Sequence, residues 1–194
     1  FPAEFHAQTA VECALELQPQ VAGRWQEIER VFIRTHESAL RIIDKQGPLH
    51  NPADRDHCLQ YMVAVALLRG RLTAADYEDD AAADARIDLL RARMVVSEEP
   101  RFSVDYLDPG KRSIANALQI FFTDGSRTPE VTIEYPLGHC RRRAEGIPVL
   151  VDKFRSNLAR RFPPAQQERI HESSRDVRQF GQMAVHTYLD QYVP

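Results

Sequence analysis

The chain has 194 residues, which is enough for one sizeable core or two small ones, and we expect a main body with an appended lobe. Hydrophobic residues make up 43% and charged residues 27% of the chain, a balance typical of globular proteins and unlike that of disordered or fibrous ones. The formal net charge of −3 gives no global indication of binding to nucleic acid or to a membrane, although a local basic patch can still hold an anion.

The chain contains neither a membrane-spanning stretch nor a paired-cysteine motif. The longest apolar run, residues 62–68, is too short to cross a bilayer, and the first ten residues lack the pattern of a secretory leader, so we expect a cytoplasmic protein. Cys13, Cys58 and Cys140 lie far apart, which fits reduced thiols and offers no zinc-binding spacing. Three cysteines would suffice in number for an iron–sulfur cluster, but such ligands usually include a close pair.

The first elements are a helix, a strand and a short helix. Apolar residues at helical spacing predict a helix over residues 3–17, which Pro19 ends. Because a helix begins almost at once, the chain reads as a fragment of something longer. Residues 28–36 alternate between polar and β-branched side chains, which predicts a strand, and residues 37–44 form a short helix.

One helix of about eighteen residues is predicted from Ala53, with Gly70 ending it. Its second half is apolar, whereas its first half carries a crowd of polar side chains: Asp54, Arg55, Asp56, His57, Gln60 and Tyr61. Helical spacing puts Asp54, His57 and Tyr61 on one face near the N-terminal end, where free backbone N–H groups favour an anion. Such a cluster can hold a carboxylate and exchange a proton. The alternative is that the aspartates cap the helix and that His57 and Tyr61 satisfy each other at a domain boundary.

Further helices are predicted before and after a second strand region, the hairpin over residues 114–136. Thr73 and Asp76 have the spacing of a capping box for a short helix over residues 73–79, and a further helix over 84–94 carries Ile87, Leu90 and Met94 on one face. Residues 114–136 predict a β-hairpin around Asp124-Gly125. After a polar loop over 136–148, three helices follow over 148–162, 164–176 and 183–193. The order indicates an α+β fold.

Two other groups of residues are candidates for binding. The loop with His139 and Arg141 is basic, and guanidinium groups suit polycarboxylates and phosphates, although a charged turn in water is the commoner explanation. Glu4, His6 and Gln8 alternate with apolar residues at the first helical turn, where a lone histidine is most often structural. The remaining histidines, His36, His50, His171 and His186, belong to no motif. Phosphate-loop, GxSxG and HExxH motifs do not occur.

Four stretches closely resemble the MmgE/PrpD-type family of 2-methylcitrate dehydratases. They are FPAEFHAQTAVE, the run from RTHESALRIID through NPADRDHCLQYMVAVALLRGRLTAADYED, DPGKRSIANALQIFFTDGSRTPEVTIEYPLGHCRRR, and GIPVLVDKFRSNLARRFP. The likeness covers nearly the whole chain and weakens over residues 171–183. Family members extend much further upstream, so the chain resembles only their C-terminal part.

The resemblance implies an architecture. A mixed α/β lid domain with a short antiparallel sheet would span residues 25–143, bracketed by helices of an all-helical domain. Residues 1–24 would be part of that helical domain, and residues 144–194 would be its C-terminal helices. The active site would lie in the cleft between the two domains of the full-length homodimer.

The resemblance also implies a reaction, the loss of water from 2-methylcitrate to give 2-methyl-cis-aconitate in the methylcitrate cycle of propionate catabolism. No cofactor or metal is expected, and the substrate is a small tricarboxylate. A base must remove a weakly acidic proton, an acid must protonate the leaving hydroxyl, and cations must stabilise the charge that develops on the adjacent carboxylate.

By the same resemblance we expect two sets of site residues in this chain. The catalytic set is Tyr61, His57 and His6, and the substrate-binding set is Arg55, Glu4, Gln8, His139 and Arg141. Further family residues lie upstream of Phe1, so the chain alone is expected to be inactive. The alternatives are another activity of the same family (a citrate or aconitate hydratase, a cis-aconitate decarboxylase or an epimerase) and an inactive fragment that only binds or associates through an exposed apolar face.

Overall fold

The computed structural model describes residues 1–193, and the chain divides into two compact units, Phe1–Pro136 and Leu137–Pro194. Every strand of the described chain lies in the first unit. The assignment of residues 1–24 and 144–194 to one helical domain, with 25–143 as the lid, stays a prediction. Among residues 1–193, no helix combines the length and the apolarity that crossing a membrane requires.

The first unit is built on a mixed four-stranded sheet, which confirms the α+β class. Its order is β2-β1-β3-β4, with β1 at Ile28–Thr35, β2 at Met94–Glu98, β3 at Asn116–Phe122 and β4 at Val131–Ile133. The pairs β1–β3 and β3–β4 are antiparallel, as expected, whereas β2 runs parallel to β1. The strand β2 was not predicted, because Met94 was assigned to the preceding helix.

Buried and exposed side chains alternate along the strand β1, except near its start, where the pairing with β3 is irregular. Val31 and Ile33 are buried on the side that faces the core, and Arg34 lies on the other side, half-buried. Strict alternation would place Ile28 on the same side as Arg30, yet Ile28 is 1% exposed. The pairing with β3 shifts register between Ile28 and Arg30, and an extra residue at such a bulge moves the preceding side chain to the opposite face.

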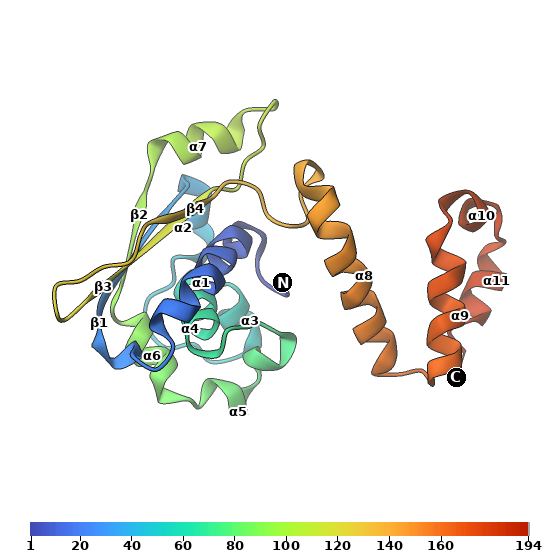
Figure 1. Ribbon diagram of the computed structural model, residues 1–194, viewed down its shortest axis with the longest axis horizontal. Helices are drawn as coiled ribbons and strands as arrows, with labels where there is room; N and C mark the ends of the chain where they lie inside the picture. Colours follow the sequence, from blue (N-terminus) through green and yellow to red (C-terminus); the bar gives the residue numbers. More distant parts are fainter. Residues whose placement is uncertain (194) are drawn as a thin grey trace. The chain divides into compact units, whose positions relative to one another are not determined.

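The helices α1 (Gln8–Val21) and α4 (Leu59–Arg69) pack against each other, and α1 also packs against β3 and β4 (Figure 1). The expectation that Pro19 ends the first helix was wrong, because α1 continues through this proline to Val21. A proline so close to the end removes only one backbone hydrogen bond, and Val21, which is 1% exposed, remains part of the core.

The predicted helix over residues 53–70 is two helices, which corrects the expected common face of Asp54, His57 and Tyr61. The short helix α3 (Pro52–Asp56) ends at His57, and α4 starts after Cys58, whose backbone is extended at φ −121° and ψ 107°. This break gives α4 its own orientation, in which every residue from Leu59 to Leu67 is buried. Gly70 ends α4 as predicted, in the left-handed region at φ 64°.

The connections between the strands hold the remaining helices of this unit. The predicted helix after β1 is α2 (Glu37–Ile43), and a helix that was not predicted, α7 (Pro100–Leu107), follows β2. Glu99 caps α7 by accepting a hydrogen bond from the Arg101 backbone N–H, and Pro100 occupies the first helical position, which suits a residue without an N–H.

The predicted capping box is present between Thr73 and Asp76, on a 3₁₀ turn over Ala74–Tyr77. Two short helices follow, α5 (Asp79–Ala82) and α6 (Ala85–Arg91). The expected apolar face of α6 is confirmed for Ile87 and Leu90, which are buried, whereas Met94 lies beyond the helix and begins β2.

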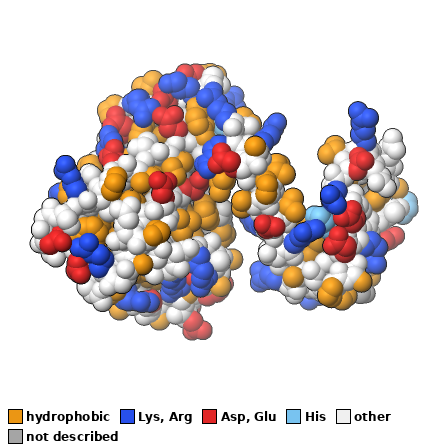
Figure 2. All heavy atoms as spheres, viewed as in Figure 1, with side chains coloured by type: hydrophobic (Ala, Val, Ile, Leu, Met, Phe, Trp, Pro, Cys, Tyr) orange, Lys and Arg blue, Asp and Glu red, His pale blue; other side chains and the backbone are white. Residues whose placement is uncertain are grey.

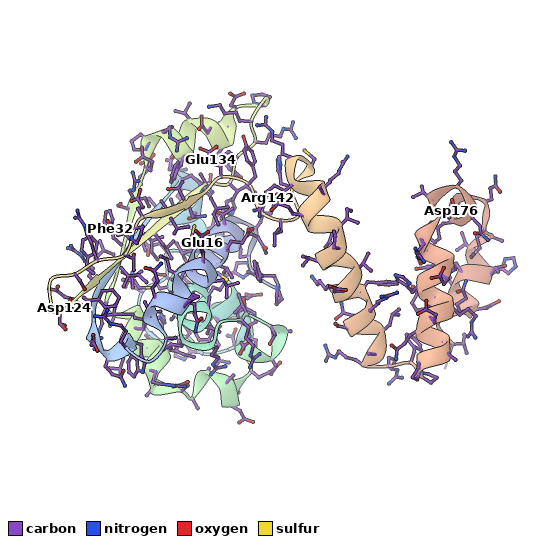
Figure 3. All side chains as sticks on the ribbon, viewed as in Figure 1. Glu16, Phe32, Asp124, Glu134, Arg142 and Asp176 are labelled. Atoms are coloured by element: carbon purple, nitrogen blue, oxygen red, sulfur yellow. The ribbon has the colours of Figure 1, made fainter. Side chains whose placement is uncertain are left out.

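The predicted hairpin is confirmed, with Asp124 at its tip (Figure 3). The Asp124 carboxylate accepts a hydrogen bond from the Ser126 backbone N–H at 2.8 Å. Gly125 has a φ of 82°, in the region where a side chain is unfavourable, which explains why glycine occupies this position.

The second unit contains α8 (Arg143–Ala159), α9 (Pro164–Arg175), α10 (Val177–Gln182) and α11 (Val185–Asp190). Three helices were expected, and the short α10 was missed. The helix α8 also begins earlier than residue 148, so part of the expected polar loop is helical and Arg142 stands just before it (Figure 3).

Two features of α8 bear on its packing. Gly146 lies so close to the Leu137 carbonyl that an added Cβ would stand 2.0 Å from that oxygen. Large apolar side chains gather along this helix (Figure 2), and Ile147, Val149 and Leu150 are about half exposed. Contiguous exposed apolar surface of this kind is unusual in a self-sufficient unit.

Candidate active site

The histidine His6 is held in one orientation by Glu4. Glu4 caps the 3₁₀ turn Phe5–Ala7: its carboxylate accepts a hydrogen bond from the His6 backbone N–H at 2.8 Å and a second from the His6 ring Nδ1 at 2.7 Å. Since a carboxylate only accepts, Nδ1 carries the hydrogen, and Nε2 of the neutral ring carries the lone pair. His6 is 7% exposed. This is the arrangement of an oriented imidazole base.

The Glu4 carboxyl is kept ionised by these contacts. Burial by itself would raise its pKa, but the hydrogen bonds from the His6 side chain and backbone outweigh that effect, so the pKa lies below its usual value. The positive charge that His57 carries when protonated acts in the same direction. An ionised Glu4 stabilises a positive charge on His6, which forms whenever the ring takes up a proton.

The backbone around His6 is fixed by bonds to two other elements. The Asn116 side-chain amide, at the start of β3, donates to the His6 carbonyl at 2.9 Å and to the Thr9 hydroxyl at 2.8 Å. The Glu4 backbone N–H donates to the Asp56 carbonyl at the end of α3, at 3.3 Å. These hydrogen bonds hold the His6 backbone in one position, and a catalytic group requires such fixed placement.

Two aromatic residues that sequence reasoning did not select complete this cluster. The Tyr106 hydroxyl of α7 lies 3.2 Å from His6 Nε2. The ring of His36, which precedes α2, stacks on Tyr106 with centroids 4.7 Å apart and planes at 17°, and its centroid lies 5.1 Å from that of His6. No local motif marks either residue, because the contacts join positions far apart in the chain.

His36 is an uncharged member of the cluster. It is fully buried, and its Nδ1 lies 3.5 Å from the Ala115 carbonyl, while its Nε2 has no hydrogen-bond partner among residues 1–193. Burial, together with the charge of His6, lowers its pKa to about 4. His36 therefore stacks as a neutral ring near pH 7.

Tyr61 and Arg55 lie together in a different, buried place. The Tyr61 hydroxyl donates to the Asp76 carbonyl at 2.6 Å, and the side chain is 2% exposed, which raises its pKa. The Arg55 guanidinium donates to the Tyr77 carbonyl at 2.6 Å and to the Asp79 carboxylate at 2.7 Å. Both residues hold the segment over 76–79 in place, and their expected contacts with substrate stay predictions.

The other expected residues are dispersed. His57 is half-exposed and pairs with Asp56, Nδ1 to Oδ1 at 2.6 Å. The Gln8 amide donates to two carbonyl groups of the N-terminal segment, at Phe1 and Ala3. In the second unit, His139 accepts the Arg141 backbone N–H at 3.2 Å and caps a turn, and Arg141 is exposed. Their roles also stay predictions.

Three side chains of α9 have a metal-like grouping: Glu168, His171 and Glu172. The guanidinium of Arg155 stands 3.2 Å from His171 Nδ1, however, and a fixed cation there opposes a metal ion. The geometry gives no support to a metal at this place.

Comparison with known proteins places the chain in a family. Residues 1–179 match the MmgE/PrpD C-terminal domain. All of this chain aligns with 2-methylcitrate dehydratases of Salmonella typhimurium at 63% identity and of Escherichia coli K12 at 62%, covering 41% of each. It aligns likewise with a mitochondrial 2-methylcitrate dehydratase of Yarrowia lipolytica at 51% identity, covering 37% of it. The chain thus spans about two fifths of the length of these relatives. The resemblance is confirmed, and the chain belongs to the MmgE/PrpD family, of which it carries the C-terminal domain.

Proposed function

We propose that this chain is the C-terminal part of a 2-methylcitrate dehydratase, a hydro-lyase of propionate catabolism. The observation that carries the proposal is the identity of 63% and 62%, over the whole chain, to proteins of that name. The Glu4–His6 pair supports it chemically, because an imidazole with a fixed tautomer suits reversible proton transfer.

The proposed reaction is an elimination. A base removes the proton next to a carboxylate of 2-methylcitrate, the electron pair of the broken C–H bond forms the new double bond, and the hydroxyl leaves with a proton from an acid as water. His6 is the proposed base, and Glu4 stabilises the imidazolium that results. We also keep His57 and Tyr61 as proposed catalytic residues, the latter on the basis of the family resemblance.

The trianionic substrate needs cations. Arg55, His139 and Arg141, with the amide of Gln8, are the proposed substrate contacts in this chain. Arg55 is buried, whereas the carboxylate of its partner Asp79 is 82% exposed and so can be replaced by another anion that reaches Arg55. Arg55 is therefore proposed to exchange Asp79 for a substrate carboxylate. The protein is further proposed to work in the cytoplasm as a homodimer and without a cofactor.

The test is a substrate comparison with the full-length protein that carries this chain. The protein is supplied with 2-methylcitrate, citrate and cis-aconitate in parallel, and the conjugated double bond is followed by ultraviolet absorption. The proposal predicts the highest kcat/KM for 2-methylcitrate. Release of carbon dioxide from cis-aconitate would point to a decarboxylase of the same family, and higher kcat/KM on citrate to a hydratase.

We expect the isolated 194-residue chain to be inactive. It should not turn over 2-methylcitrate, because the proposed site needs residues of the longer protein. Measurable dehydration by the isolated chain would contradict this. The exposed side chains of Ile147, Val149 and Leu150 should instead make the isolated chain self-associate, which light scattering detects. A purely monomeric chain would argue against an association role.

A further inference from the structure

We propose that His6 exchanges its proton through the hydroxyl of Tyr106, so that Glu4, His6 and Tyr106 act as one proton relay and Tyr106 is the group that meets the substrate. This inference rests on the proposed function for its chemistry, but its hydrogen-bond geometry can be tested without any substrate.

The first step is that His6 has one basic position. Glu4 accepts from Nδ1 at 2.7 Å, and the ionised carboxylate cannot donate in return. The lone pair of the neutral ring is therefore at Nε2, and the only site that can take up a proton is Nε2.

The second step is that His6 Nε2 already accepts a hydrogen bond from Tyr106. The Tyr106 hydroxyl lies 3.2 Å from Nε2, and with Nδ1 as the hydrogen-bearing nitrogen the phenol must be the donor. An aromatic nitrogen has one lone pair in the ring plane. A proton from any other molecule must either displace Tyr106 or arrive through its oxygen.

The third step is that Tyr106 is not free to turn aside. Its ring stacks on His36 at 4.7 Å, and His36 is fully buried. The helix that carries Tyr106 is anchored by Phe102, which is 1% exposed, and by Ser103, whose hydroxyl oxygen accepts the Glu37 backbone N–H at 2.9 Å. His6 is 7% exposed, whereas Tyr106 is only partly buried, so the tyrosine is the more accessible end of the pair.

The charged and titratable groups around His6 favour the uptake of a proton by its ring, as a relay requires. Glu4 faces Nδ1 from its own turn, His57 acts on Glu4 from the end of α3, and His36 faces it from the residue after β1. His36 is neutral near pH 7, and within residues 1–193 the charged group that is hydrogen-bonded to the His6 ring is the Glu4 carboxylate. A proton that reaches His6 is thus stabilised by a direct ion pair.

The proton transfer balances without a further reactant. As the Tyr106 oxygen takes the proton from the substrate carbon, its own hydrogen passes to His6 Nε2, and the electrons of the C–H bond form the double bond. Tyr106 ends neutral, His6 ends as imidazolium beside Glu4, and the hydroxyl leaves as water with a proton from the general acid. Regeneration returns the proton from Nε2 through Tyr106 to solvent, and the general acid takes up one proton from solvent, so that no net proton is gained or lost.

The kinetic test uses two changes at Tyr106 in the full-length protein. Tyr106→Phe keeps the ring that stacks on His36 and removes the hydroxyl, and it should lower kcat for 2-methylcitrate by about 100-fold or more with little change in KM. A ring-fluorinated tyrosine at the same position keeps the hydroxyl but changes its acidity, so it should change kcat and the pH profile. A merely structural tyrosine would show neither dependence.

The matched control is Tyr188 of α11, whose hydroxyl pairs with that of Tyr192 within the second unit. The same two changes there should leave kcat as it is. If Tyr106→Phe keeps kcat within about threefold of the parent, or if the fluorinated residue has no effect on kcat, the relay is wrong.

A spectroscopic measurement separates this inference from the proposed function. The ¹⁵N signals of the His6 ring should show hydrogen on Nδ1 and an accepted hydrogen bond at Nε2 in the parent protein, and Tyr106→Phe should remove the latter. Tyr106→Phe can remove the hydrogen bond at Nε2 even if 2-methylcitrate is not a substrate. In that case the proposed function is wrong, while the hydrogen bond from Tyr106 to His6 is confirmed. An Nε2 signal that is the same in both proteins overturns the relay whatever the substrate.

Discussion

The buried histidine His36 should make the stability of the fold depend on pH in a defined window. Its pKa is lowered from 6.5 to about 4 in the folded protein, by burial first and by the charge of His6 second. In the unfolded chain it titrates near its ordinary value. Between these two values the unfolded state binds the additional proton, so the free energy of unfolding falls as the pH falls.

The size of the effect follows from the two pKa values. His36 contributes its full stabilisation above the unfolded value, and that contribution is lost progressively as pH falls towards 4. The total is about 3 kcal/mol, of which about 2 kcal/mol is lost between pH 7 and pH 5. Because the ring is fully buried, little of this is screened by solvent.

The assay is urea unfolding of the parent chain and of His36→Asn at pH 7 and pH 5. Asparagine places an amide nitrogen near the position of the imidazole Nδ1, which faces the Ala115 carbonyl, and it does not titrate. All other titratable groups are common to both proteins, so the difference in pH dependence belongs to His36. If both proteins lose the same stability between the two pH values, the neutral buried histidine is refuted.

Two further predictions concern stability. Asp76 is 1% exposed and accepts hydrogen bonds from Arg69, Arg71 and Thr73, so Asp76→Ala should lower the free energy of unfolding by about 3–5 kcal/mol. Glu37→Ala, at the exposed ion pair with Arg41, should lower it by no more than about 1 kcal/mol, and equal losses in denaturant titrations would contradict this. In helices, Gly146→Ala should destabilise the second unit by about 1–3 kcal/mol because its Cβ would meet the Leu137 carbonyl, while Gly181→Ala in α10, with open space around it, should stabilise by about 0.5–1 kcal/mol; thermal unfolding that ranks them in the opposite order would refute the close approach.

Sequence patterns correctly predicted the elements that depend on residues close together in the chain. The strand β1, the helix α2, the hairpin around Asp124 and Gly125, and the box formed by Thr73 and Asp76 each depend on residues within a few positions of one another. The family resemblance added the α+β class, which side-chain periodicity alone had only indicated.

The errors have a physical cause in common. The break between α3 and α4 arises from the backbone of His57 and Cys58, and apolar periodicity does not register a change of backbone conformation. The strand β2 depends on a parallel partner in β1, about sixty residues away in sequence, and a short run of β-branched residues gives no sign of that partner.

The same limit applies to the candidate site. Glu4 and His6 are two residues apart and could be proposed from the sequence, but Tyr106 and His36 reach them only because α7 and the end of β1 meet the N-terminal turn in the fold. Tyr61 was selected on the family resemblance, and helical spacing also placed it beside Asp54 and His57. Because the helix is broken at His57, Tyr61 contacts the Asp76 carbonyl instead.

The role of His6 is tested most directly by the kcat for 2-methylcitrate of His6→Asn in the full-length protein that carries this chain. We expect kcat to fall by at least about 100-fold, with KM changed little and with the folded structure intact by circular dichroism. A His6→Asn protein that turns over 2-methylcitrate within about threefold of the parent would contradict the assignment of His6 as the base.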